Sequence, residues 1–303
     1  MNVELSALYP IALVLLGVLA SVTRLVKSDV FDKFPQFLFA VCYPCIILQV
    51  ISRNDFFKMI TENTYSTLFM TTFTLAAMIF GLIVAKWVKE DGKKPVVKFA
   101  MMGNNTTFIG LPVAMFIFGE RGVVFVLFCS VVQDLFTWTA GYRFYSKQKN
   151  SSPFSALINP IMISFVSALI LSLAGTPEIP IFDDVVEAFG AMTMPIALFY
   201  MGHVFVEYKA AIFRIRWRVL VLSAVKVIAF PAITALVLLP LPIDPFFKNV
   251  SIFVSGLPVA LLTVMFSKQF DKDSGFAVEL ILSSTAMYLL VISILVHFQV
   301  FAL

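Results

Sequence analysis

The sequence predicts an all-α membrane protein in which ten transmembrane helices form two inverted five-helix repeats. Three observations support this fold class: the composition, the number of apolar segments and an internal repeat. Hydrophobic residues make up 60% of the 303 residues, and charged residues make up only 13%. A soluble domain has roughly a quarter of its residues charged, because its surface faces water. Most of this surface is therefore expected to face lipid.

Ten apolar segments follow one another along the chain, each with about the 20 residues that a helix needs to cross a bilayer. Glu4 precedes the first segment and Arg24 and Lys27 follow it, so we interpret it as an anchor and not as a cleaved signal peptide. The polar stretch 146–152 separates the two predicted repeats, 1–150 and 151–303. The segments lie near residues 5–23, 34–52, 65–88, 96–118, 122–144, 157–174, 184–206, 218–239, 248–268 and 276–300.

The distribution of Lys and Arg predicts the orientation, because cytoplasmic loops carry an excess of both. Loops on the side of the N-terminus hold four of the 22 basic residues, namely Arg53, Lys58, Arg121 and Lys248. The opposite loops hold 17, and Lys226 lies within a segment. This bias predicts a multi-pass protein of the cell (plasma or inner) membrane with the N-terminus and the C-terminus both outside.

The internal repeat points to a mechanism. Residues 110–114 (GLPVA) in the fourth segment recur as residues 256–260 in the ninth, 146 residues later. Since each unit holds five helices, the second must enter the membrane from the opposite side, as in many secondary transporters. Proline breaks a helix and glycine loosens it. We therefore expect helices 4 and 9 to be broken and to cross near the midplane, where the freed backbone groups line protein or a watery cavity.

A polar run, 103–107 (GNNTT), precedes the first of these two motifs. Two adjacent amides in an apolar segment are not expected to face lipid, although they can also join helices by hydrogen bonds. We expect Asn105 to donate to a carboxylate or to accept from a hydroxyl. The predicted substrate-binding residues are Asn104, Asn105, Thr106, Gly110, Pro112, Gly256, Leu257 and Pro258.

Three charged residues in or beside the segments are candidates for coupling or charge recognition. Asp134 lies near the middle of the fifth segment, where an ionised carboxylate costs at least ~2.5 kcal/mol, so it pairs, binds a cation or exchanges a proton. Lys226 in the eighth segment is a charge partner for Asp134 or an attractor for an anionic substrate. Glu279 lies about a turn into the tenth segment, and we expect it, like His203, to be solvated at the interface.

Residues 105–112 (NTTFIGLP), followed by Phe118 and Gly119, resemble the fourth-span signature of the auxin efflux carrier (AEC) family. Pro195 with Gly202, the second Gly-Leu-Pro and residues 283–285 (SST) extend the resemblance over essentially the whole chain. It implies a ten-helix fold similar to that of the bile-acid/sodium symporters, usually dimeric. Helices 1, 2, 6 and 7 would form a scaffold, and helices 3–5 and 8–10 a mobile transport domain. It also implies an elevator-type motion and a carboxylate substrate.

The predicted function is secondary active transport of a small organic anion by alternating access, with the lipid bilayer and a second copy of the chain as partners. The coupling ion would be H⁺ or Na⁺, and no cofactor is expected. A sodium/proton antiporter is the alternative, although such transporters use paired mid-membrane carboxylates and Asp134 stands nearly alone. We expect no enzyme, because no nucleophile with a base and no metal set stands out. Cys42 and Cys45 are interpreted as buried thiols without a metal, and no basic patch indicates nucleic acid.

Overall fold

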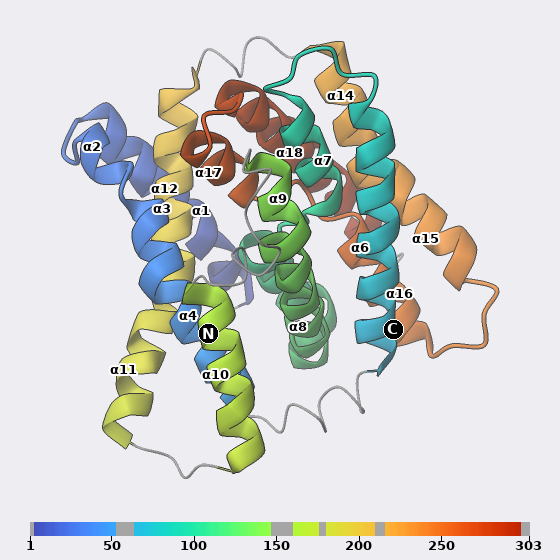
Figure 1. The fold of residues 1–303 in the computed structure, drawn as a ribbon. Helices are drawn as coiled ribbons and strands as arrows, with labels where there is room; N and C mark the ends of the chain where they lie inside the picture. Colours follow the sequence, from blue (N-terminus) through green and yellow to red (C-terminus); the bar gives the residue numbers. More distant parts are fainter. Residues whose placement is uncertain (1–2, 53–63, 147–159, 176–179, 210–215, 298–303) are drawn as a thin grey trace. The chain divides into compact units, whose positions relative to one another are not determined.

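The computed structural model describes residues 3–52, 64–146, 160–175, 180–209 and 216–297, and within these ranges every regular element is a helix (Figure 1). The one β-type pairing recorded among them is an isolated bridge between Asn104 and Val259. The expectation of an all-α protein is therefore confirmed for the described part of the chain.

The chain divides into two compact units, each built from two separate stretches of sequence. The first unit comprises residues 1–64 and 148–207, and the second comprises residues 65–147 and 208–303. Each unit thus takes residues from both halves of the chain.

In the first unit, α1 packs on α12, and α4 packs on α10 and α11. Its elements are α1 (Val3–Val22), α2 (Ser28–Phe31), α3 (Phe34–Phe37), the π-helical η1 (Leu38–Cys42), α4 (Tyr43–Ser52), α10 (Pro160–Ala174), α11 (Pro180–Ala191) and α12 (Thr193–Glu207). Two glycines allow α1 and α12 to approach closely: a Cβ at Gly17 would overlap the backbone of Phe199, and one at Gly202 would overlap the backbone of Val14 and Val18. Small residues at a helix contact are the usual device for close packing in membranes.

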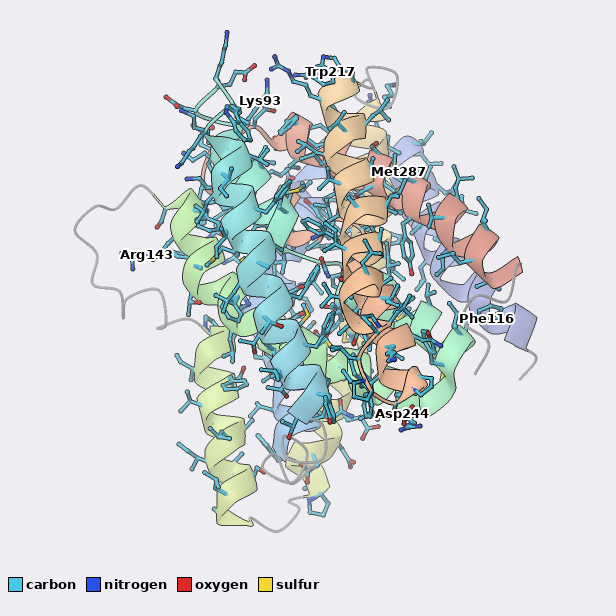
Figure 2. The ribbon with its side chains drawn as sticks, turned by 90° about the vertical axis from the view of Figure 1, so that its right-hand side faces the viewer. Lys93, Phe116, Arg143, Trp217, Asp244 and Met287 are labelled. Carbon is cyan, nitrogen blue, oxygen red and sulfur yellow. The ribbon has the colours of Figure 1, made fainter. Side chains whose placement is uncertain are left out.

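The second unit contains the remaining helices. They are α6 (Thr64–Ala85), α7 (Lys94–Met102), η2 (Thr106–Gly110), α8 (Leu111–Phe136), η3 (Thr137–Gly141), α9 (Tyr142–Tyr145), α14 (Trp217–Ala224), η5 (Val225–Ala229), α15 (Phe230–Leu238), α16 (Pro245–Ser255), α17 (Leu262–Gln269) and α18 (Ser274–His297). A buried cluster that includes Phe125, Val254 and Leu257 forms its core. Figure 2 shows Lys93 and Trp217 at one end of this unit and Asp244 at the other.

Within the described ranges, six helical stretches are long and apolar enough to cross a membrane. They are Ser28–Gln49, Thr64–Ala85, Arg121–Tyr145, Pro180–Glu207, Trp217–Leu238 and Ser274–Val296. Large apolar side chains on them are exposed, such as Leu290 at 68%, as expected where lipid is the solvent. A membrane protein is thus confirmed, whereas the count of ten spans and the inverted repeat stay predictions.

A single glycine separates the predicted fourth and fifth segments. Within α8, Gly119 has φ 64° and ψ −160°, a conformation that is not helical. This region of backbone conformation is essentially restricted to glycine. Gly119 therefore bends the chain where the sequence predicted one segment to end and the next to begin.

Candidate functional site

Two helices of the second unit are interrupted. The first interruption lies between Met102, where α7 ends, and Thr106, where η2 begins, and Gly103 there has an extended backbone with φ −79° and ψ 113°. The second lies between Ser255, where α16 ends, and Leu262, where α17 begins. The expected break at Gly256–Pro258 is therefore present.

The break in helix 4 lies elsewhere than we predicted. The backbone is helical at Gly110, with φ −60° and ψ −50°, and Pro112 lies just after the π-helical η2 in a helical run that begins at Thr106. A π-helical turn replaces the regular α-helical bonding just before the proline, so the helix accommodates a residue that lacks an N–H donor. The chain breaks instead at residues 103–105, in the polar run. The side chain of Pro112 lies outside the described part of the structure.

The two interruptions cross and bond to each other. The Asn105 amide donates to the Pro258 carbonyl at 2.9 Å, and the Ala260 amide donates to the Gly103 carbonyl at 3.1 Å. Between these bonds Asn104 and Val259 form the isolated antiparallel bridge. Each break thus satisfies part of the backbone of the other, as a membrane interior requires.

Asn104 holds the crossing together. Its side-chain Nδ2 donates at 2.8 Å to the Val254 carbonyl near the end of α16, which also accepts from the Leu257 amide at 3.2 Å. Gln133 on α8 forms two hydrogen bonds with the Asn104 backbone. Its Nε2 donates to the Asn104 carbonyl at 2.7 Å, and its Oε1 accepts from the Asn104 amide at 3.0 Å. Asn104 is only 1% exposed. Its bonded groups therefore serve the framework of the crossing.

Asn105 differs from its neighbour. It is 2% exposed, and within the described residues its side-chain Nδ2 is buried without a hydrogen-bond partner. Its backbone is already engaged, since its carbonyl accepts from the Gly110 amide at 2.9 Å. A buried donor without an acceptor costs about 1–3 kcal/mol. Asn105 Nδ2 is therefore the better candidate of the two side-chain amide nitrogens for an outside acceptor.

Lys226 lies at the same crossing. Its side chain is completely buried, and Nζ donates to the Met101 carbonyl at 2.6 Å, two residues before the break. The carbonyl end of a helix carries partial negative charge, which favours a cation. The ammonium also lies 5.7 Å from the centroid of the Phe230 ring. The sequence predicted a charge at this depth, but not its carbonyl partner.

Helix α18 contributes Ser284, which sequence reasoning did not place in the site. The Val259 amide donates to Ser284 Oγ at 3.1 Å, which ties the second interruption to α18. The flanking Ser283 Oγ and Thr285 Oγ1 are buried without hydrogen-bond partners among the described residues. Three consecutive hydroxyl residues within an apolar segment were the sequence signal for this edge of the site.

The other two candidate charges lie on different helices. Asp134 is 7% exposed and follows Gln133 directly on α8. The expectation that Glu279 is solvated is wrong, because its side chain is 5% exposed and Oε1 accepts from Arg216 Nη2 at 2.9 Å. Arg216 is 48% exposed and directly precedes α14, so the Glu279 carboxylate pairs with a cation from another segment instead of with water. His203 is also buried, at 3% exposed, which corrects the interfacial interpretation.

The remaining predicted residues pack the crossing. Thr106 is 3% exposed. A Cβ at Gly110 would lie 2.9 Å from Leu257 Cδ1, so the two Gly-Leu-Pro motifs touch. A Cβ at Gly256 would lie 3.1 Å from Pro231 Cγ on α15. These glycines give room for close packing between helices at the crossing.

Comparison with known proteins identifies a family and a relative that match most of the chain. The family described as "Membrane transport protein" matches residues 6–155 and 148–296. An uncharacterized transporter of Methanocaldococcus jannaschii is 25% identical over 293 residues, which cover 93% of this chain and 94% of the relative. Both matches include the two interruptions and the charges beside them.

Proposed function

The chain belongs to the membrane transport protein family, in agreement with its resemblance to the auxin efflux carriers, and from this premise we propose that it is a secondary transporter of a small carboxylate. The observation that carries the proposal is the crossing at residues 103–105 and 256–261, where two interrupted helices meet around buried polar groups. Interrupted helices that face each other are the characteristic binding device of secondary transporters.

Carboxylate as the substrate class follows from the donors at the crossing. Asn105 Nδ2 offers an N–H that has no acceptor among the described residues, and Lys226 offers a positive charge. An ammonium has three donors, so the bond to the Met101 carbonyl leaves two for a ligand. Hydrogen bonds between such a cation and a carboxylate are short and strong. Both donors therefore favour a small organic anion.

Alternating access would follow from the division of the chain into two units. All residues of the crossing belong to the second unit, which we propose is the mobile transport domain. The first unit, with α1–α4 and α10–α12, would be the scaffold against which it moves as an elevator. We propose that the transporter works as a homodimer in the cell membrane, with both termini outside, and that Asp134 couples transport to H⁺ or Na⁺.

A sodium/proton antiporter remains the second candidate, because α8 carries a buried carboxylate, Asp134, next in sequence to a residue of the crossing. Asp134 follows Gln133, and Gln133 bonds to the backbone of Asn104. In this alternative the cation would bind at Asp134, and Lys226 would supply the charge that balances the site when the cation leaves. Both candidates use the same residues, so transport assays must separate them.

Uptake into proteoliposomes tests the proposal. The wild type and Asn105→Ala would be compared over a panel of labelled mono- and dicarboxylates, with and without sodium and pH gradients. Asn249→Ala, on the first half of α16, serves as the matched control. Saturable uptake of one acid that is lost in Asn105→Ala and kept in Asn249→Ala supports an anion carrier. Proton movement driven by a sodium gradient, without uptake of any acid, would instead establish the antiporter.

A further inference from the structure

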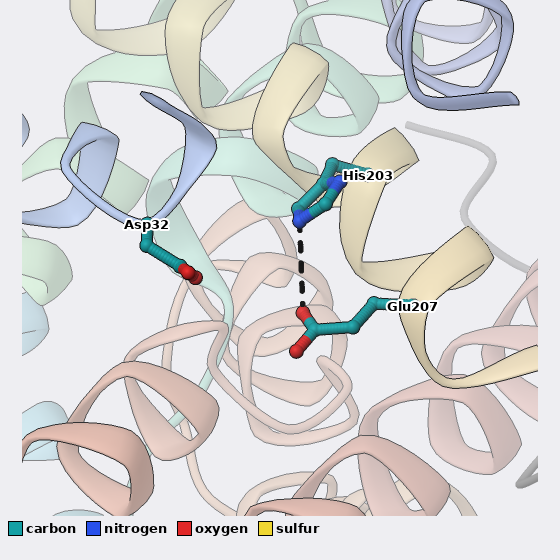
Figure 3. Close-up of side chains that lie close together, drawn as sticks. All are labelled: Asp32, His203 and Glu207. Carbon is teal, nitrogen blue, oxygen red and sulfur yellow. Dashed lines mark ion pairs between the residues drawn. The ribbon is translucent and has the colours of Figure 1, made fainter. Parts of the chain in front are cut away.

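We propose that Asp32, His203 and Glu207 in the first unit form a binding site for a divalent transition-metal ion such as Zn²⁺. One ligand atom from each residue lies within 4.8 Å of the other two. Figure 3 shows the imidazole and the two carboxylates turned toward a common space. The site belongs to the first unit, so it is separate from the crossing of the interrupted helices.

The donor set fits this class of ion. One imidazole nitrogen and two carboxylates are ligands that Zn²⁺ accepts, at about 2.0–2.2 Å, with a water in the fourth position. Two ligand atoms on a tetrahedral ion at these lengths are about 3.4 Å apart. His203 Nε2 and Glu207 Oε2 are already 3.7 Å apart. A small inward rotation of the Asp32 and Glu207 side chains would complete the geometry.

The histidine is held in the orientation that a ligand needs. Its Nδ1 lies 2.9 Å from Ser21 Oγ on α1, and the ring stacks on Phe31 at 4.1 Å between centroids with an interplanar angle of 2°. When Nδ1–H donates to Ser21, the lone pair of Nε2 points toward the carboxylates. Metal-binding histidines characteristically use their second nitrogen in this way. The imidazole is thus fixed before any ion binds.

The backbone explains how these groups meet. His203 and Glu207 are four residues apart on α12 and so share one face of the helix. Ser21 follows Gly17 by one turn, and His203 follows Gly202 directly, so the close glycine contact between α1 and α12 brings Ser21 to the imidazole. Asp32 ends α2 and comes from the turn next to Phe31. Three separate elements therefore converge on the site.

An ion can reach the site from water. Asp32 is exposed, and the Glu207 side chain is 32% exposed, whereas His203 is buried. The accessible carboxylates would capture the ion, and the fixed imidazole would complete its coordination. A bound ion would join the end of α2 to α12 and stiffen that part of the first unit.

Zinc binding to the purified full-length protein tests this proposal. After removal of metals with a chelator, equilibrium dialysis against ZnCl₂ should give one ion per chain, and the melting temperature should rise with zinc. Asp32→Asn and Glu207→Gln keep the size of each side chain and should each weaken binding by at least about tenfold. Asp29→Asn, on an exposed residue of α2 outside the cluster, is the matched control and should bind zinc as the wild type does.

Two results would overturn the proposal. The first is no stoichiometric zinc in the wild type. The second is wild-type zinc affinity in both Asp32→Asn and Glu207→Gln, measured on variants that melt at the wild-type temperature without zinc. Binding through thiols would be lost in Cys45→Ser and kept in Glu207→Gln, the reverse of the expected pattern. None of these readouts depends on transport, so failure here leaves the proposed function untouched.

Discussion

The side-chain amide of Gln133 forms two hydrogen bonds with the backbone of Asn104. It donates to the Asn104 carbonyl at 2.7 Å and accepts from the Asn104 N–H at 3.0 Å. Both partners are buried, and the two residues are 29 positions apart in the sequence. The pairing replaces the helical hydrogen bonds that Asn104 loses at the interruption. It fixes the position from which the neighbouring Asn105 presents its own side chain.

Replacing Gln133 should destabilise the protein. Gln133→Leu removes both bonds and leaves a buried N–H and a buried C=O at Asn104, each of which costs about 1–3 kcal/mol. Gln133→Glu keeps an acceptor for the N–H but brings a carboxylate oxygen to the carbonyl, so it should also be harmful. Thermal melting in detergent measures both. Gln49→Leu, a glutamine of the first unit, is the control, and equal melting of Gln133→Leu and wild type would contradict this role.

The two adjacent asparagines should separate into a structural and a functional residue. Asn104→Ala removes the bond to the Val254 carbonyl and should lower the melting temperature. Asn105→Ala removes a buried donor that has no partner in the described part of the chain, so stability should be unchanged or slightly higher while carboxylate uptake is lost. Melting curves and uptake of both variants provide the comparison. If Asn104→Ala alone abolished uptake at normal stability, the assignment would be reversed.

Gly119→Ala should be costly although there is open space around this residue. No atom of the described residues outside its chain neighbours lies within 4 Å of a Cβ placed there, but the φ of 64° with ψ −160° is a conformation that side chains disfavour. Such backbone strain costs of order 1–3 kcal/mol. Thermal melting should therefore fall for Gly119→Ala and stay near wild type for Gly92→Ala, where a Cβ meets nothing closer than 3.7 Å. Equal melting of the two variants would show that the bend relaxes freely.

The orientation predicted from basic residues can be tested without a substrate. Single cysteines at positions 2 and 303 should react with a membrane-impermeant maleimide added to intact cells, because both termini are predicted outside. Both positions lie outside the described residues. A version with the three native cysteines, Cys42, Cys45 and Cys129, replaced by serine is the background. Labelling of one terminus only after lysis would refute the even number of spans.

The sequence patterns located some features of the site and missed others for identifiable reasons. The break at Gly256–Pro258 was predictable, since a glycine and a proline in mid-segment weaken the helix together. The prediction was wrong for the same motif at Gly110–Pro112, because the π-helical turn η2 lies just before the proline and the helix continues through it. The break there depends on Gln133 and on Pro258, which replace helical bonds from elsewhere in the chain. Local patterns do not contain such partners.

Long-range pairing also explains the errors on charged residues. Glu279 was predicted to be interfacial because it lies at the start of an apolar segment, yet it accepts a hydrogen bond from Arg216, which is 63 positions away in the sequence. His203 lies near a segment end but stacks on Phe31 from another helix. Hydropathy gives the depth of a residue along its own helix. It does not show on which face of the helix the residue lies or which neighbouring helix packs against that face.

Lys226 provides the sharpest test of the anion site. Lys226→Met keeps the length of the chain and removes a charge that is fully buried, so stability should be unchanged or higher, because an apolar group suits that position better. Carboxylate uptake should nevertheless fall by at least about tenfold, since each lost 1.4 kcal/mol of binding is a factor of ten. Uptake kinetics and melting temperature of the same preparation give both quantities.

Lys226→Arg separates charge from geometry. Arginine keeps the positive charge, but its planar guanidinium is larger than an ammonium and is not interchangeable with it. At a site where Nζ lies 2.6 Å from the Met101 carbonyl, the larger group should disturb the end of α7 and lower the melting temperature. Normal uptake by Lys226→Met would show that the buried ammonium only caps the carbonyl end of α7. The substrate would then be recognised by Asn105 without a fixed positive charge.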